Sequence, residues 1–120
     1  MAKSVANDVL DAALGEIATS TTLTVCSADP VNYAGIAAVT LASVTVAGGD
    51  FTIADGTTSG RQTTVGEQAG VSITASGDAT HVVLDDGVTM LYGTTAPTQT
   101  LTSGGTVTVA AWSVEIADPA

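Results

Sequence analysis

Short alternating runs of apolar and polar residues fill the chain from Thr22 onward, and they constrain its fold more than any other feature. Gly, Asp, Asn and Pro interrupt these runs at short intervals, which is typical of strands joined by tight turns. The pattern predicts a mainly β fold, a single-domain β-sandwich or small barrel over residues 21–120. The expected strands cover residues 22–27, 38–47, 51–54, 61–65, 71–75, 80–85, 89–94, 99–102 and 106–117.

Residues 4–18 predict one α-helix ahead of the strands, because apolar residues recur there at helical spacing. Ser4 is the expected N-cap. A helix of this length is not stable alone, so its apolar stripe must dock, either on its own sheet or on a neighbouring chain. We therefore expect residues 1–20 to form an N-terminal helix or arm, with Leu10, Leu14 and Ile17 as candidate contacts to a partner or to another subunit.

Local patterns also predict turns, a loop and a bend. Residues 85–87 have the sequence Asp-Asp-Gly between two apolar runs, which predicts a hairpin turn, and residues 76–78 predict another reversal. Residues 27–35 predict a surface loop, because Pro30 lacks an N–H and restricts the residue before it. The alternation changes phase near residues 110–111, where a bulge or bend would restore the facing of the later side chains.

The charge of the chain restricts its partners. Two basic residues stand against twelve acidic ones, which gives a net charge of −10. Nucleic-acid binding is excluded, because phosphate contacts need clustered Lys and Arg. No membrane partner is predicted, since no run approaches the roughly eighteen apolar residues of a spanning helix. The acidic, amphipathic start of the chain is unlike a signal peptide and predicts synthesis in a cytoplasm.

The residues that usually carry catalysis do not form a recognisable motif. Cys26 is the only cysteine, and a buried strand position is its simplest interpretation. His81 is the only histidine and lies in an alternating strand pattern with no triad signature nearby. The acidic residues fall mainly in turns, where Asp commonly caps backbone amides. The sequence therefore predicts neither an enzyme nor a metal or cofactor site.

Arg61 and Trp112 are the two side chains for which the sequence indicates a specific contact. Arg61 is the only basic residue beyond Lys3, and it could pair with a carboxylate inside the chain or across a subunit boundary. The loop before it, residues 56–60, lacks the Gly-Lys-Ser/Thr ending of a phosphate loop and is expected to connect two strands. Trp112 is the only tryptophan, and its alternating surroundings favour a core position over a sugar-stacking one.

Three stretches of the chain carry a family resemblance: residues 7–14, 50–61 and 112–119. Their order and spacing resemble a family of small structural proteins of tailed bacteriophages, over nearly the whole chain. Size and β-rich composition are similar to those of capsid decoration, or cement, proteins. The resemblance implies a protein made in the host bacterial cytoplasm and located on the capsid surface of the virion. Its implied partner is the major capsid protein, and a homo-oligomer, with a trimer favoured, is implied by the symmetry axes of a capsid.

Two other functions stay open from the sequence. A tail or fibre-associated protein would occur in few copies per virion. A host-surface glycan-binding module would need an exposed aromatic side chain such as Trp112 or Tyr33. In the decoration role, Arg61 joins Leu10, Leu14 and Ile17 as a candidate capsid or intersubunit contact.

Overall fold

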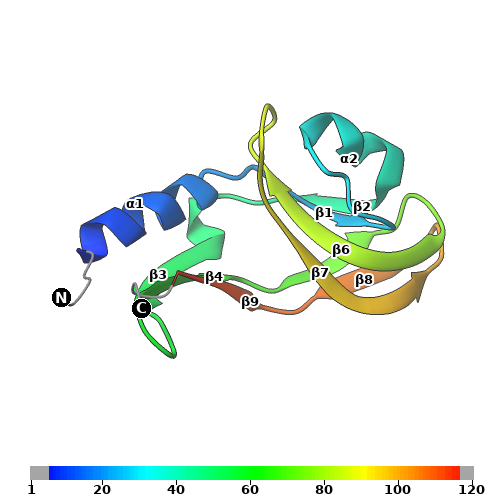
Figure 1. The fold of residues 1–120 in the computed structure, drawn as a ribbon. Helices are drawn as coiled ribbons and strands as arrows, with labels where there is room; N and C mark the ends of the chain where they lie inside the picture. The colour runs from blue at the N-terminus through cyan, green and yellow to red at the C-terminus, as the bar shows by residue number, and fades with distance from the viewer. Residues whose placement is uncertain (1–5, 117–120) are drawn as a thin grey trace.

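The computed structural model describes residues 6–116, and it confirms a small, mainly β, single domain with several antiparallel sheets and an N-terminal helix. The molecule is elongated, with extents of 54 × 25 × 24 Å (Figure 1). Its radius of gyration of 15.2 Å exceeds the value of about 13.6 Å expected for a compact domain of 120 residues.

The largest sheet has four strands in the order β2-β1-β6-β7. All neighbours in it are antiparallel: β1 (Thr22–Cys26) pairs with β2 (Thr40–Thr45) and β6 (Gly77–Asp85), and β6 pairs with β7 (Met90–Leu101). Alternate side chains of β1 and β6 point into the main core, where Leu23 and Leu84 are fully buried. These apolar side chains are the ones whose period-two spacing predicted the strands.

A second group of strands forms a long two-stranded ribbon with one added edge strand. A three-residue 3-10 turn, Gly48–Asp50, leads into β3 (Phe51–Asp55), which pairs with β4 (Arg61–Val65). Further along the ribbon, β5 (Gln68–Ser72) pairs with β8 (Thr106–Val109), while β9 (Trp112–Ile116) completes a three-stranded sheet in the order β3-β4-β9.

The predicted bend at residues 110–111 is confirmed, because β8 ends at Val109 and β9 begins at Trp112. The partner strand is interrupted at the same level, since Val65 pairs with Trp112 and Gln68 pairs with Val109. A register shift then follows within β5, before Val71. The side-chain phase change seen in the sequence therefore reflects a bend of the whole ribbon.

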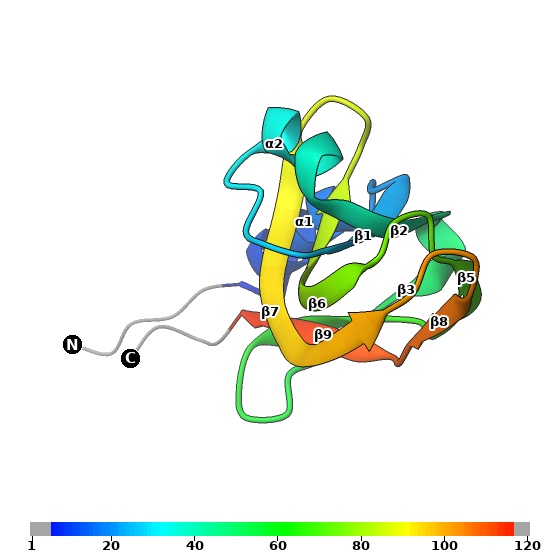
Figure 2. The ribbon, with the colours of Figure 1, turned by 90° about the vertical axis from the view of Figure 1, so that its right-hand side faces the viewer.

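The four-stranded sheet and the β5–β8 pair surround the main core like an incomplete barrel. An isolated bridge between Ala42 and Ile73 joins the β2 edge to the ribbon. Figure 2, a view along the length of the molecule, shows β1, β2, β5, β6, β7 and β8 arranged around one interior. Among the described strands, no pairing joins β7 to β8 or β9, so the barrel is open at this point.

Helix α1 (Asn7–Ile17) confirms the predicted N-terminal helix and lies against the ribbon, where it contacts β3 and β4 (Figure 1). Of the two docking modes left open by the sequence, the structure shows docking on its own chain. The expected N-cap, Ser4, lies outside the described residues; the helix begins after Ala6, which makes no side-chain capping bond.

The prediction of a surface loop over residues 27–35 is wrong at its end, because a second helix, α2 (Tyr33–Val39), begins there. Its N-cap is Asn32, whose side chain accepts a hydrogen bond from the Gly35 N–H at 3.0 Å. Gly35 permits a close approach, since a Cβ there would lie 2.1 Å from the Pro30 carbonyl oxygen. The same helix shortens the expected strand 38–47, which begins at Thr40 instead.

Three further strand predictions and one turn prediction need correction. Residues 89–94 and 99–102 belong to one strand, β7, which continues through Pro97. Pro97 is tolerated because β7 is an edge strand and its register with β6 is irregular at that level. The expected reversal at residues 76–78 is also wrong, since Gly77 already begins β6. The expected strand 71–75 is replaced by β5, which covers residues 68–72.

Docking of α1 on its own chain predicts a stability cost for Leu14→Ala. Leu14 is fully buried, so we expect the free energy of unfolding to fall by about 2–5 kcal/mol, as for other core leucines. Urea unfolding followed by circular dichroism measures this loss. Val9→Ala is the matched control, because Val9 is 60% exposed on the same helix and its truncation should cost less than about 0.5 kcal/mol. Equal, small losses for both variants would contradict the docked helix.

Candidate functional site

The candidate contacts on the N-terminal helix face inward, to the rest of the chain. Leu10 is 6% exposed and Leu14 is 0% exposed, on a helix that contacts β3, β4 and β7. Ile17 is partly buried against the main core. The structure thus brings the three residues together on the docked face of α1, and the outer face of the helix, which includes Val9, is left for other contacts.

Arg61, on β4 of the ribbon, binds helix α1 through hydrogen bonds. Its Nε donates to Asp11 Oδ1 at 2.8 Å, its Nη2 donates to Asp11 Oδ2 at 3.4 Å, and its Nη1 donates to Asp55 Oδ1 at 2.7 Å. Hydrogen bonds to Asp11, and then to Asp55, raise the pKa of Arg61 above its ordinary value. The pair with a carboxylate expected for this lone arginine is therefore formed inside the chain, and it joins α1 to β3 and β4.

A second set of hydrogen bonds, which the sequence did not predict, involves Glu115 on β9. Its Oε1 accepts hydrogen bonds from the backbone N–H and hydroxyl of Thr57, and from the N–H of Thr58 at 3.3 Å. The loop of residues 56–60 connects β3 to β4, as expected, and Glu115 anchors it to the opposite edge of the sheet. Gly56 makes room for the carboxylate, because a Cβ there would lie 2.6 Å from Glu115 Oε1.

The residues considered for catalysis, Cys26 and His81, lie opposite each other on β1 and β6. Cys26 is fully buried, as expected, and burial, with a smaller contribution from Asp29, raises the pKa of its thiol to about 11. His81 Nδ1 lies 2.9 Å from the Thr80 hydroxyl. Asp29 and His81 both line a hollow of about 360 Å³, but no hydrogen bond or ion pair joins them within residues 6–116.

The acidic residues of the β6–β7 hairpin stabilise its turn. Asp86 Oδ1 accepts hydrogen bonds from the N–H groups of Thr89 at 2.7 Å and Val88 at 2.9 Å, and these bonds lower the pKa of Asp86. Asp85 accepts from the Gly87 N–H at 3.0 Å, and Gly87 has the positive φ of 92° that the sequence predicted for this turn. Within the described part of the chain, no three His, Cys, Asp or Glu residues are grouped to hold a metal ion.

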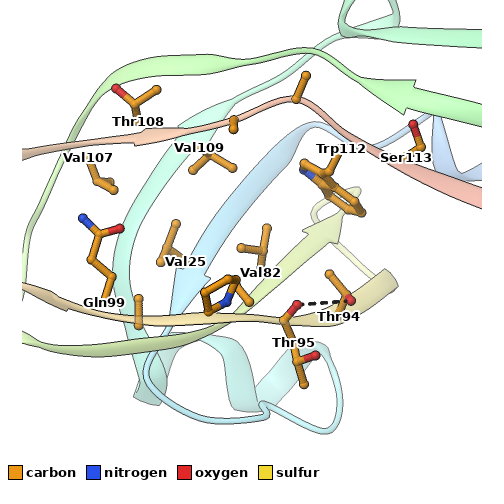
Figure 3. A pocket seen from close by; sticks show the side chains of 15 residues that line it. Val25, Val82, Thr94, Thr95, Gln99, Val107, Thr108, Val109, Trp112 and Ser113 are labelled. Carbon is orange, nitrogen blue, oxygen red and sulfur yellow. Dashed lines mark hydrogen bonds between the residues drawn. The ribbon is translucent and has the colours of Figure 1, made fainter.

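A larger cavity, of about 490 Å³, opens where the barrel is incomplete, between β7 and the β8–β9 strands. Figure 3 shows Val25 and Val82 pointing from the four-stranded sheet into this space, below Val109 and Trp112. None of the described residues that line it is charged. They are Val25, Ala79, Val82, Thr94, Thr95, Ala96, Pro97, Gln99, Val107, Thr108, Val109, Ala110, Ala111, Trp112 and Ser113.

Trp112 has features of both positions considered for it from the sequence, the core position and the sugar-stacking position. Its ring packs against the main core and stacks on Tyr92, with ring centroids 5.8 Å apart, and it also lines the cavity. Its indole N–H is buried and has no hydrogen-bond partner among residues 6–116. Tyr33, the other aromatic side chain considered for glycan binding, is 41% exposed at the start of α2.

No family model, curated protein or solved structure matches this chain. Among residues 6–116, neither helix is long and apolar enough to cross a membrane.

The Arg61 contacts predict how α1 responds to substitution. Arg61→Gln removes the cation between Asp11 and Asp55, so we expect α1 to open more often while β1 and β6 are unaffected. Arg61→Lys keeps the charge but loses the two-nitrogen contact to Asp11, and it should have an intermediate effect. Amide hydrogen exchange by NMR measures both. Unchanged exchange of the α1 amides in Arg61→Gln would show that the apolar contacts alone hold the helix.

Burial of Cys26 predicts an unreactive thiol. With a pKa of about 11, about one thiol in a thousand is ionised at pH 8, so the native protein should react with a disulfide reagent far more slowly than the protein in urea. The folded-state pKa is above that of the unfolded chain. Stability from the neutral thiol is therefore complete below about pH 8.5 and is lost as the pH rises toward 11. Cys26→Ala should abolish that part of the alkaline destabilisation.

Proposed function

We propose that this protein is a capsid decoration, or cement, protein of a tailed bacteriophage. It binds the outer surface of the head and stabilises the shell by bridging subunits of the major capsid protein. The proposal starts from the resemblance carried by residues 7–14, 50–61 and 112–119. The described structure supports it by its shape, its charge and the way its parts are held together.

The observation that carries the proposal is the elongated shape of the domain, together with the polar contacts that hold α1 and the 56–60 loop on the ribbon. A protein that bridges two subunits needs separate contact surfaces held at a fixed distance, and this domain is 54 Å long but only about 25 Å across. Arg61 and Glu115 tie α1 and the 56–60 loop to the ribbon. A standard interface takes about 800 Å² from each partner. Two such surfaces would use about a quarter of the 6352 Å² of accessible surface.

The charge of the domain supports an outward position on the shell. A net charge of −10 is repelled by packaged DNA, so the outer face of the capsid is the favourable location. Binding in this role needs complementary surfaces and no reacting group. Three observations agree with that requirement: Cys26 is buried, His81 Nδ1 lies within hydrogen-bond distance of the Thr80 hydroxyl, and the hairpin acids accept hydrogen bonds from the backbone of their turn.

Docking of α1 changes how its residues would contribute to attachment. Leu10, Leu14, Ile17 and Arg61 fix the helix on the ribbon, so capsid contacts would come from its outer face and from surfaces beyond it. A homotrimer at the local symmetry axes of the shell is the assembly that we propose, since such axes repeat across the whole capsid.

The proposal predicts many copies of this protein in each virion. Quantitative mass spectrometry of purified virions should give copy numbers comparable with that of the major capsid protein. Undecorated particles should also take up the purified protein to saturation and then survive heating better than the same particles without it. A handful of copies per particle would instead indicate a tail or fibre role, and absence from virions would overturn the virion assignment.

A further inference from the structure

The hollow of about 360 Å³ lies on the outer face of the four-stranded sheet, away from the main core. Alternate residues of β6 point into that core, so His81 and Val83, which line the hollow, point outward. Helix α2 contacts β1 on this outer face, where Ile36 packs with Cys26 and Val83. The helix leaves the hollow beside it, over β6 and β7.

The floor of the hollow depends on a glycine in the middle of a strand. Gly93 of β7 pairs with Val83 of β6, and its φ is not positive, so the backbone there does not require glycine. Glycine inside a strand weakens the strand and often marks a place that a ligand approaches closely. A Cβ at Gly93 would lie 3.3 Å from Val83 Cγ1 and 3.7 Å from Met90 Cε, so a side chain would take space from the hollow.

One rim of the hollow is a strained turn. The Asn32 N–H donates to the Pro30 carbonyl oxygen at 2.8 Å and closes three residues around Val31. Val31 has a φ of 71°, which is costly for a β-branched residue, and its apolar side chain is 75% exposed. Strain of this kind is concentrated at binding sites. The turn keeps Val31 at the hollow, where Val83 and Met90 are the other apolar side chains of the lining.

Asp29 gives the hollow a negative charge that no cation balances. Its Oδ1 accepts a hydrogen bond from the Val31 N–H at 2.9 Å, and no ion pair involves it among residues 6–116. Burial, and then the charge of Asp29, raise the pKa of the Cys26 thiol to about 11, so this charge acts on the neighbouring groups. His81 and Thr95, which pair across β6 and β7, add an imidazole and a hydroxyl group to the lining.

This combination of groups selects a short aliphatic ammonium ion. Apolar walls suit an alkyl stem and a carboxylate suits a cationic head, the two parts that a lysine side chain combines. A guanidinium pairs best with both oxygens of a carboxylate, whereas Asp29 Oδ1 already accepts from Val31; a compact ammonium needs one oxygen. Ligand pockets span about 300–1,000 Å³, so a hollow of about 360 Å³ takes a small ligand.

We propose that this hollow binds a primary ammonium group on a short aliphatic stem, carried by a free amine or by a lysine side chain of another protein. The ammonium group pairs with Asp29, and the stem packs against Val31, Val83 and Met90. The proposal goes beyond the decoration function and does not rest on it.

The test titrates the full-length protein with n-butylammonium chloride at constant ionic strength and follows the backbone amides by NMR. We expect saturable shifts at Asp29, Val31, His81, Gly93 and Thr95, with a dissociation constant in the millimolar range for so small a ligand. Neutral n-butanol should bind about tenfold more weakly, and butyrate should not bind. A lysine derivative blocked at both backbone ends separates the sources: tighter binding than n-butylammonium assigns the site to a protein lysine, and exclusion assigns it to a free amine.

Two variants test the residues. Asp29→Asn keeps an acceptor for the Val31 N–H but removes the charge, so it should weaken n-butylammonium binding about tenfold. Asp8→Asn removes the same charge from the exposed surface of α1, outside the hollow, and should change binding less than about twofold. Gly93→Ala, checked for folding by its amide spectrum, should weaken binding several-fold by filling the floor.

Three outcomes would overturn the proposal. They are the absence of saturable shifts with both amines, equal binding of n-butanol and n-butylammonium, and wild-type affinity of Asp29→Asn. Each leaves the decoration function untouched, because copy number and particle binding are measured separately.

Discussion

The rest of the structure depends on how the ribbon is interrupted. Strand pairing stops between β4–β9 and β5–β8, but the register of the two strands is the same on both sides of this break. Residues 66–67 lie opposite residues 110–111, between the Val65–Trp112 and Gln68–Val109 pairs. On one side of the interruption the ribbon covers the main core, and on the other side it supports β3 and α1. The bend therefore produces both the elongated shape and the open edge of the barrel.

Polar ties hold the part of the ribbon that lies beyond the main core. Among the described residues, the buried apolar side chains outside the core clusters are Leu10, Leu14 and Val114, so Arg61 and Glu115 supply contacts that a larger core would make unnecessary. Their acceptors and donors come from distant parts of the chain, which couples α1, the 56–60 loop and β9. A domain held in this way can present its two ends at a fixed separation, which is what the proposed bridging function requires.

Much of the secondary structure could be predicted because it follows from local patterns. The hairpin turn at Asp86-Gly87 and the bend at residues 110–111 were both visible, the first as turn chemistry and the second as a change of phase. Helix α2 was missed because seven residues hold too few periods to be recognised; Asn32 before it was the available signal. The pairing of Arg61 with Asp11 was not identifiable, since the two residues lie fifty positions apart in the sequence.

The sequence by itself determined a small acidic β domain with an N-terminal helix, because alternation, turn residues and net charge are properties of neighbouring residues and of simple sums. Tertiary structure alone decided that the helix docks on its own chain, that Trp112 stacks on Tyr92, and that β7 and β8–β9 leave a gap between their edges. These features depend on strand order and on contacts between distant residues. Strand order is selected by the total free energy of packing, which no single stretch of the chain contains.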